Sequence, residues 1–123
     1  MKEVADEMQT EIEIAGRKYT IRRPSRAEMY SSGLQYLSNL LDELRRTLSQ
    51  EANIEKKKEL QEEIIKLQYE YERKLLLTCV DEIKEEDLEK LDYLEWYQLV
   101  DRVIDFVFLK PMEELRVRRR KNG

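Results

Sequence analysis

The side chains that most often carry out catalysis are scarce in this 123-residue chain. It contains no histidine, and Cys79 is its only cysteine. Histidine-based triads, zinc fingers and disulfide frameworks are therefore excluded. Because Cys79 stands among Leu75, Leu76, Leu77 and Val80, we expect it to be a small buried core residue rather than a nucleophile.

Carboxylates are abundant, but their surroundings do not favour acid–base catalysis. Adjacent acids such as Glu62–Glu63 lie in highly charged stretches, whereas general acid–base work needs carboxylates in a cleft with their pKa values pushed apart. The three glycines also stand too far apart for a phosphate-binding loop. We therefore predict that the chain is not an enzyme and uses neither a cofactor nor a metal.

Two basic stretches could bind phosphate groups. Residues 17–26 hold five bases and no acid, and residues 116–121 hold another five bases and no acid. The whole chain, however, has 27 acids against 23 bases, and no aromatic side chain lies between the bases of the second stretch to stack on nucleotides. These features do not favour nucleic acid as a partner, although a nucleic-acid-binding regulator stays an alternative.

The composition favours one mainly helical domain over residues 1–123. Charged and hydrophobic residues each make up 41%, and 3 Gly and 2 Pro are too few for the turns of a β-sandwich or barrel. No apolar run reaches the roughly 18 residues of a membrane span, so no membrane contact is expected. A lone thiol without a signal peptide indicates the cytoplasm.

Four segments make up this domain. Residues 1–9 are polar and are expected to be flexible. Residues 10–23 alternate apolar and polar side chains on both sides of a glycine-containing turn, which predicts a β-hairpin. Residues 25–110 form a helical body, and residues 111–123 are expected to be a basic flexible tail. The predicted fold is thus a β-hairpin packed on a long antiparallel αα-hairpin, plus a C-terminal helix.

Regular spacing of apolar side chains predicts the αα-hairpin. Residues 26–49 form its first helix after a capping box at Ser25–Glu28. The seam of this helix consists of Ala27, Tyr30, Leu34, Leu37, Leu41, Leu44 and Leu48. A second stripe, out of phase with the first, consists of Leu60, Ile64, Leu67 and Tyr71. The phase change predicts a turn at residues 49–53, although one long bent helix stays an alternative.

The last predicted helix, residues 93–109, has more apolar surface than a core contact requires. Pro111 is expected to end it. Its apolar side chains cover about 200° of the circumference, against about 100° for a stripe that faces a core. Either the hairpin and the αα-hairpin cover both flanks, or one flank stays open for a partner. The candidate partner-binding residues are Trp96, Val100, Ile104, Val107 and Phe108.

Two motifs give the chain a resemblance to a known family. The first is Ile-Glu-Ile-Ala-Gly-Arg-Lys-Tyr-Thr-Ile-Arg-Arg-Pro-Ser, residues 12–25. The second is Glu-Glu-Asp-Leu-Glu-Lys-Leu-Asp-Tyr-Leu-Glu-Trp-Tyr-Gln-Leu-Val, residues 85–100. With a helical middle between them, residues 10–110 resemble the tail assembly chaperones of long-tailed bacteriophages and prophages.

The resemblance implies a non-enzymatic role in the host cytoplasm. Such chaperones bind the long, helical tape measure protein and keep it soluble until tube subunits polymerise around it, and they are absent from the finished virion. The tail tube protein is a second candidate partner, and family members tend to form homo-oligomers. The main alternative is a coiled-coil adaptor or structural homo-oligomer, in which the seam from Leu34 to Leu48 pairs between chains.

Overall fold

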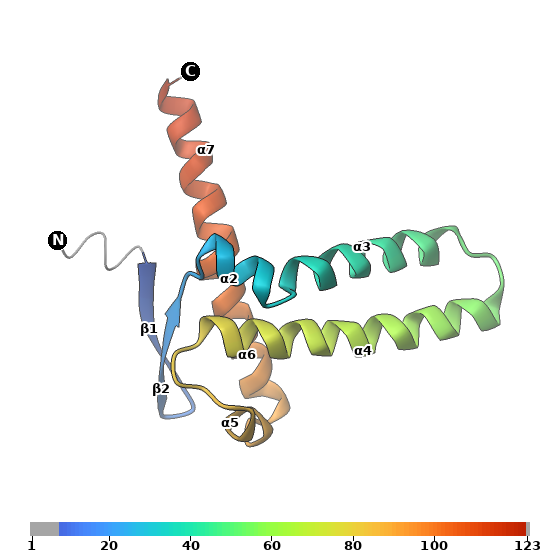
Figure 1. Cartoon of the computed structure of the whole chain (residues 1–123), viewed down its shortest axis with the longest axis horizontal. Helices are drawn as coiled ribbons and strands as arrows, with labels where there is room; N and C mark the ends of the chain where they lie inside the picture. The colour runs from blue at the N-terminus through green and yellow to red at the C-terminus, as the bar shows by residue number, and fades with distance from the viewer. Residues whose placement is uncertain (1–7, 123) are drawn as a thin grey trace. The chain divides into compact units, whose positions relative to one another are not determined.

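The computed structural model describes residues 8–122, which form a two-stranded hairpin followed by helices (Figure 1). In chain order the elements are β1 (Gln9–Ile14), β2 (Arg17–Arg22), α2 (Arg26–Ser31), α3 (Leu34–Gln50), α4 (Ile54–Cys79), α5 (Glu85–Glu89), α6 (Tyr93–Ile104), the π-helix η1 (Asp105–Leu109) and α7 (Lys110–Asn122). The predicted mainly helical fold with an N-terminal hairpin is confirmed. Of the flexible start predicted for residues 1–9, residues 1–7 lie outside the described part, and Gln9 already belongs to β1.

Contacts divide the described chain into two compact units. The hairpin unit combines the described parts of Met1–Pro24 and Leu76–Gly123, and the helical-pair unit is Ser25–Leu75. The single domain inferred from the chain length stays a prediction.

The hairpin forms where alternating side chains meet a two-residue turn. β1 and β2 pair antiparallel with Ile14 opposite Arg17, which leaves Ala15 and Gly16 as the turn. Both turn residues have positive φ, 52° and 79°, as the two-residue turns that match strand twist require. The alternation places Ile12, Ile14 and Ile21 on one face, and all three are buried.

The end of α4 extends this small sheet. Val80 forms an antiparallel bridge with Ile21, and the Asp81 N–H donates to the Thr20 carbonyl at 2.9 Å. An ion pair of 3.2 Å joins Arg22 to Asp81 beside the bridge. The buried apolar side chains of the hairpin unit are Ile12, Ile14, Ile21, Leu76, Cys79, Val80, Leu88, Leu99, Val100, Val103 and Phe106. The prediction that Cys79 is a core residue is therefore confirmed.

In the helical-pair unit, the segment predicted as one helix, residues 26–49, forms two helices, α2 and α3. The capping box forms as predicted, since Ser25 Oγ accepts from the Glu28 N–H and a Glu28 carboxylate oxygen accepts from the Ser25 N–H. The helix then breaks, because Gly33 adopts φ 81°, a left-handed conformation that favours glycine. Ala27 and Tyr30 on α2 are consequently exposed, so their assignment to the buried seam is wrong.

The α3 part of the seam is buried as predicted, at Leu34, Leu37 and Leu41. The chain turns at residues 51–53, which rules out one long bent helix. Asn53 caps α4, because its side-chain oxygen accepts from the Glu55 and Lys56 N–H groups. This cap marks the start of α4 after a turn that contains neither glycine nor proline.

Helices α3 and α4 run antiparallel and side by side (Figure 1). Near one end of the pair, Arg45 Nη2 on α3 donates to Gln68 Oε1 on α4 at 2.7 Å. Toward the other end, the Lys74 ammonium donates to the Ser32 carbonyl at 3.5 Å. The predicted αα-hairpin is therefore confirmed.

The prediction that Pro111 ends the last helix is wrong. Elements α6, η1 and α7 follow one another without a non-helical residue from Tyr93 to Asn122. We call residues 93–122 the helical run. Residues 111–122 were expected to be part of a flexible tail, but they are helical. The π-helix η1, in the middle of the helical run, accounts for this continuation.

Candidate partner-binding surface

The helical run exposes large apolar side chains along its whole length. Among the described residues, thirteen large hydrophobic side chains are exposed, and seven of them lie in the run. These seven are Tyr93, Leu94, Tyr97, Leu109, Met112, Leu115 and Val117. Tyr93, at 75%, has the highest exposure of the thirteen. An apolar surface of this kind often marks a contact with another molecule.

A subset of the run forms a line along one side, which we call the apolar stripe. It consists of Tyr93, Tyr97, Ile104, Phe108, Met112 and Leu115. The steps of four, seven, four, four and three residues return to the same side of a helix after one or two turns. Every member is exposed or half-buried. The stripe therefore offers apolar contacts at several turns of the run, with the exposed Asp101 between Tyr97 and Ile104.

The five residues predicted to bind a partner fall into two groups. Val100 is only 3% exposed and belongs to the core of the hairpin unit. Trp96, Ile104, Val107 and Phe108 are half-buried. Their role in binding stays a prediction.

The sequence-based prediction does not include Met112 and Leu115, because it ends the last helix at Pro111. Their spacing from Phe108, four and seven residues, was the signal that could have found them.

The π-helix η1 explains how the run passes the proline. In η1 the Lys110 N–H donates to the Asp105 carbonyl, five residues back instead of four. Pro111 then falls in the first turn of α7, where its missing N–H and fixed φ are tolerated. Having no N–H, Pro111 cannot continue the π pattern to the Phe106 carbonyl, five residues before it. That carbonyl needs another donor.

Arg23, at the end of the hairpin, supplies the donor. Its Nε donates to the Phe106 carbonyl at 3.1 Å. The same guanidinium lies over the Phe106 ring, with its central carbon 4.4 Å from the ring centroid. The Arg23 side chain is 17% exposed, so both the hydrogen bond and the cation–π contact are largely shielded from water. Arg23 thus joins the hairpin to the middle of the helical run.

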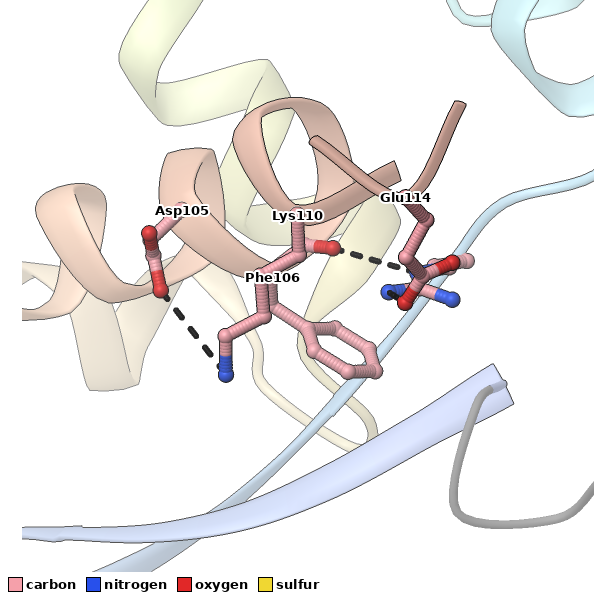
Figure 2. Close-up of polar contacts among 5 residues, drawn as sticks. Asp105, Phe106, Lys110 and Glu114 are labelled. Carbon is pink, nitrogen blue, oxygen red and sulfur yellow. Dashed lines mark hydrogen bonds and ion pairs between the residues drawn. The ribbon is translucent and has the colours of Figure 1, made fainter. Parts of the chain in front are cut away.

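Two further ion pairs lie at this joint (Figure 2). Glu114 approaches Arg23 at 4.0 Å, and Lys110 approaches Asp105 at 3.9 Å. The Lys110 ammonium also lies 5.9 Å from the Phe106 ring centroid. Half-exposed pairs of this length contribute little individually. The part-buried hydrogen bond from Arg23 to the Phe106 carbonyl is therefore the main contact of the cluster.

The charge of the run changes sharply past the joint. Residues 115–122 hold five bases and no acid. Arg116, Arg118, Arg119 and Arg120 are all exposed on α7. The surface thus combines an apolar stripe with a strongly basic end.

The described residues contain neither a cluster of potential metal ligands nor a helix that could span a membrane. In residues 8–122, no group of three or more Cys, Asp or Glu side chains is placed to hold a metal ion. Within the same residues, no helix combines the length and apolar character needed to cross a lipid bilayer.

Comparisons with protein-family models, with curated proteins and with solved structures found no match to this chain. The candidate surface therefore rests on its own geometry.

Proposed function

We propose that this chain is a non-enzymatic tail assembly chaperone, which binds a tape measure protein and keeps it soluble while a phage tail is built. In this proposal it acts in the host cytoplasm and is absent from the finished virion. The tail tube protein is a second candidate partner. The observation that carries the proposal is the apolar stripe, whose exposed and half-buried side chains extend over about 33 Å of helix from Tyr93 to Leu115, at 1.5 Å per residue.

The stripe suits a long helical client for two reasons. An amphipathic helix binds by laying its own apolar face along an apolar surface, with contacts one helical turn apart. The stripe presents side chains at that spacing, including the aromatic rings of Tyr97 and Phe108, which dominate many protein interfaces. The high content of charged residues, 41%, would keep such a complex in solution.

The alternative functions have less support from the contacts. Leu34, Leu37 and Leu41, which a coiled-coil adaptor would pair between chains, are already buried within the single chain. Of the basic stretch at residues 17–26, Arg22 pairs with Asp81, and Arg23 bonds to Phe106. Fewer of these bases are left for the phosphates of a nucleic acid than the sequence alone suggested.

Co-expression with a tape measure protein tests the proposal. The chain and a helical fragment of the tape measure protein encoded in the same genome are produced together. The soluble fraction of the fragment and its co-elution with the chain are then measured by size-exclusion chromatography. The double variant Met112→Asp/Leu115→Asp places two charges in the apolar stripe. Ile65→Asp is the matched control, because Ile65 is exposed on α4 in the other unit.

We expect the wild-type chain and Ile65→Asp to solubilise the fragment and co-elute with it. The double variant should lose at least ten-fold in affinity while keeping the wild-type circular dichroism spectrum, because both substituted side chains are exposed. If the wild-type chain leaves the fragment insoluble, the chaperone role is wrong. If the double variant binds as well as wild type, the client uses another surface.

A further inference from the structure

Exposed arginines continue the apolar stripe along α7. Arg116 follows Met112 by four residues, and Arg119 follows Leu115 by four residues. Side chains four residues apart on a helix are neighbours on the same side, so each arginine lies one turn further along that side of α7. Both arginines are exposed. The surface of the stripe thus passes from apolar side chains to positive charge within one turn.

The nearby acids do not neutralise these two arginines. Residues 115–122 contain no acid, and Glu114 approaches Arg23 of the hairpin at 4.0 Å. Glu113 stands three residues before Arg116, but within residues 8–122 the structure shows no ion pair between the two. Arg119 is five and six residues from these acids, beyond the spacing of side-chain pairs on a helix. The positive charge is therefore available to a bound molecule.

We propose that the stripe selects a client helix whose own apolar face ends in acidic side chains, which lie opposite Arg116 and Arg119. This inference rests on the proposed function and names the chemistry of the client segment. The apolar side chains of the client lie along Ile104, Phe108 and Met112, and its acids follow about one turn beyond them. From Ile104 to Arg119 the run rises about 22 Å at 1.5 Å per residue. The client segment is thus an amphipathic helix of about four turns.

Helix dipoles favour an antiparallel client. Arg119 lies in the last turn of α7, at the negative end of that helix. An antiparallel client places its own N-terminal turn there, where acidic side chains stabilise the client helix and also face the arginines. In a parallel client the acids would occupy the C-terminal turn and would destabilise the client helix. We therefore place the acids in the first turn of the client.

Charge complementarity alone would also fit the phosphates of a nucleic acid. The two arginines, however, adjoin Met112 and Leu115, which are 55% and 53% exposed. An amphipathic helix covers such apolar side chains together with the charges, whereas a phosphate backbone would leave them in water. The combined surface favours the acidic helix.

Fluorescence anisotropy with three labelled helical peptides tests the charge preference. The peptides share leucines at positions i, i+4, i+7 and i+11 and differ at two positions of the first turn, which hold two glutamates, two glutamines or two lysines. At 50 mM salt the full chain should bind the glutamate peptide about ten-fold more tightly than the lysine peptide, because two exposed ion pairs replace two like-charge contacts. At 500 mM salt the difference should shrink. Equal affinity for the three peptides, or binding of none at 100 µM, would overturn the inference.

Charge reversal on the chain separates the arginine contact from any effect of the glutamates on peptide helicity. Arg119→Glu leaves one favourable and one unfavourable contact, so most of the preference for the glutamate peptide should disappear. Arg118→Glu is the matched control, since Arg118 is also exposed but lies about 100° around the helix from Arg119. This control should keep the preference. An equal loss in both variants would show that net charge alone acts, and would contradict the inference.

Two further outcomes separate this inference from the proposed function. If the tape measure fragment is solubilised but the chain does not distinguish the peptides, the charge selection is wrong and the chaperone role stands. If the fragment stays insoluble but the glutamate peptide is preferred, the chaperone role is wrong and the charge selection stands. A 20-base-pair duplex DNA is the competitor in the same assay. Tighter binding of the duplex, with displacement of the glutamate peptide, would assign the arginines to nucleic acid and overturn the inference.

Discussion

The α3–α4 pair and the helical run of residues 93–122 treat their apolar side chains differently. In the pair, Leu34, Leu37 and Leu41 recur at steps of three and four and are buried within the chain. In the run, Leu99, Val103 and Phe106 are buried, but Tyr93, Met112 and Leu115 lie in solvent. Folding buries the α3 part of the seam, whereas it leaves the apolar stripe of the helical run exposed or half-buried.

The two regions also differ in what sets their helix boundaries. Around the pair, caps within three residues decide: Ser25 with Glu28 begins α2, and Asn53 begins α4. In the run, the local signal of Pro111 is overridden by a π turn and by Arg23, 83 residues from Phe106 in the sequence. A surface available for partners arises where a long-range contact extends a helix beyond its local stop signal.

The largest effect is expected in the core of the pair. Leu41 is 3% exposed, so Leu41→Ala removes buried methyl groups and leaves a cavity. The free energy of unfolding should fall by about 2–5 kcal/mol, measured by urea denaturation followed by circular dichroism. An unchanged midpoint for Leu41→Asp would show that the seam is exposed, and would remove the contrast between the two regions.

The joint of the run should show the next largest effect. Arg23→Ala deletes a shielded, charge-assisted hydrogen bond and leaves the Phe106 carbonyl without its donor. The expected loss is about 2 kcal/mol, with faster hydrogen exchange at residues 106–114.

Pro111→Ala provides the internal control for this prediction. It restores an N–H five residues after Phe106, so the cost of Arg23→Ala should shrink in that background. Equal costs in both backgrounds would show that the missing proline N–H is not why the carbonyl needs Arg23.

A smaller effect is expected at the local cap of the pair. Asn53→Ala removes the acceptor for the Glu55 and Lys56 N–H groups at the start of α4. The expected cost is about 1 kcal/mol, and Asn53→Ser should recover most of it. A loss confined to Asn53→Ala and absent from Asn53→Ser supports a cap set by sequence alone. An equal loss in both variants would point to a tertiary role for the amide.

The smallest effect is expected on the exposed stripe. Leu115→Ala should change the free energy of unfolding by less than about 0.5 kcal/mol, because the side chain is exposed in the folded chain. The same variant should weaken binding of a helical client to the apolar stripe. A loss of stability comparable with that of Leu41→Ala would mean that the stripe is core, and the distinction between the regions would fail.

Much of the fold could be predicted because its signals are local. Alternation of Ile12, Ile14 and Ile21 marked the hairpin, and the phase change between two apolar stripes marked the αα-hairpin. The broken helix at Gly33 was missed, since a heptad spacing continues through a residue whose left-handed conformation depends on the surrounding turn.

For the candidate surface, the sequence alone determined that the last helix has more apolar surface than a core needs. It also determined the basic charge of residues 115–122, because counting charges requires no coordinates. Only the tertiary structure decided which apolar side chains are left over: it buried Val100 and exposed Met112 and Leu115. For Met112 and Leu115, which follow Pro111, the physical reason is that the helix continues past the proline, where Arg23 donates a hydrogen bond to the Phe106 carbonyl that Pro111 leaves without a donor. This contact could not be predicted from the spacing of side chains within residues 93–122, because Arg23 lies 83 residues before Phe106 in the sequence.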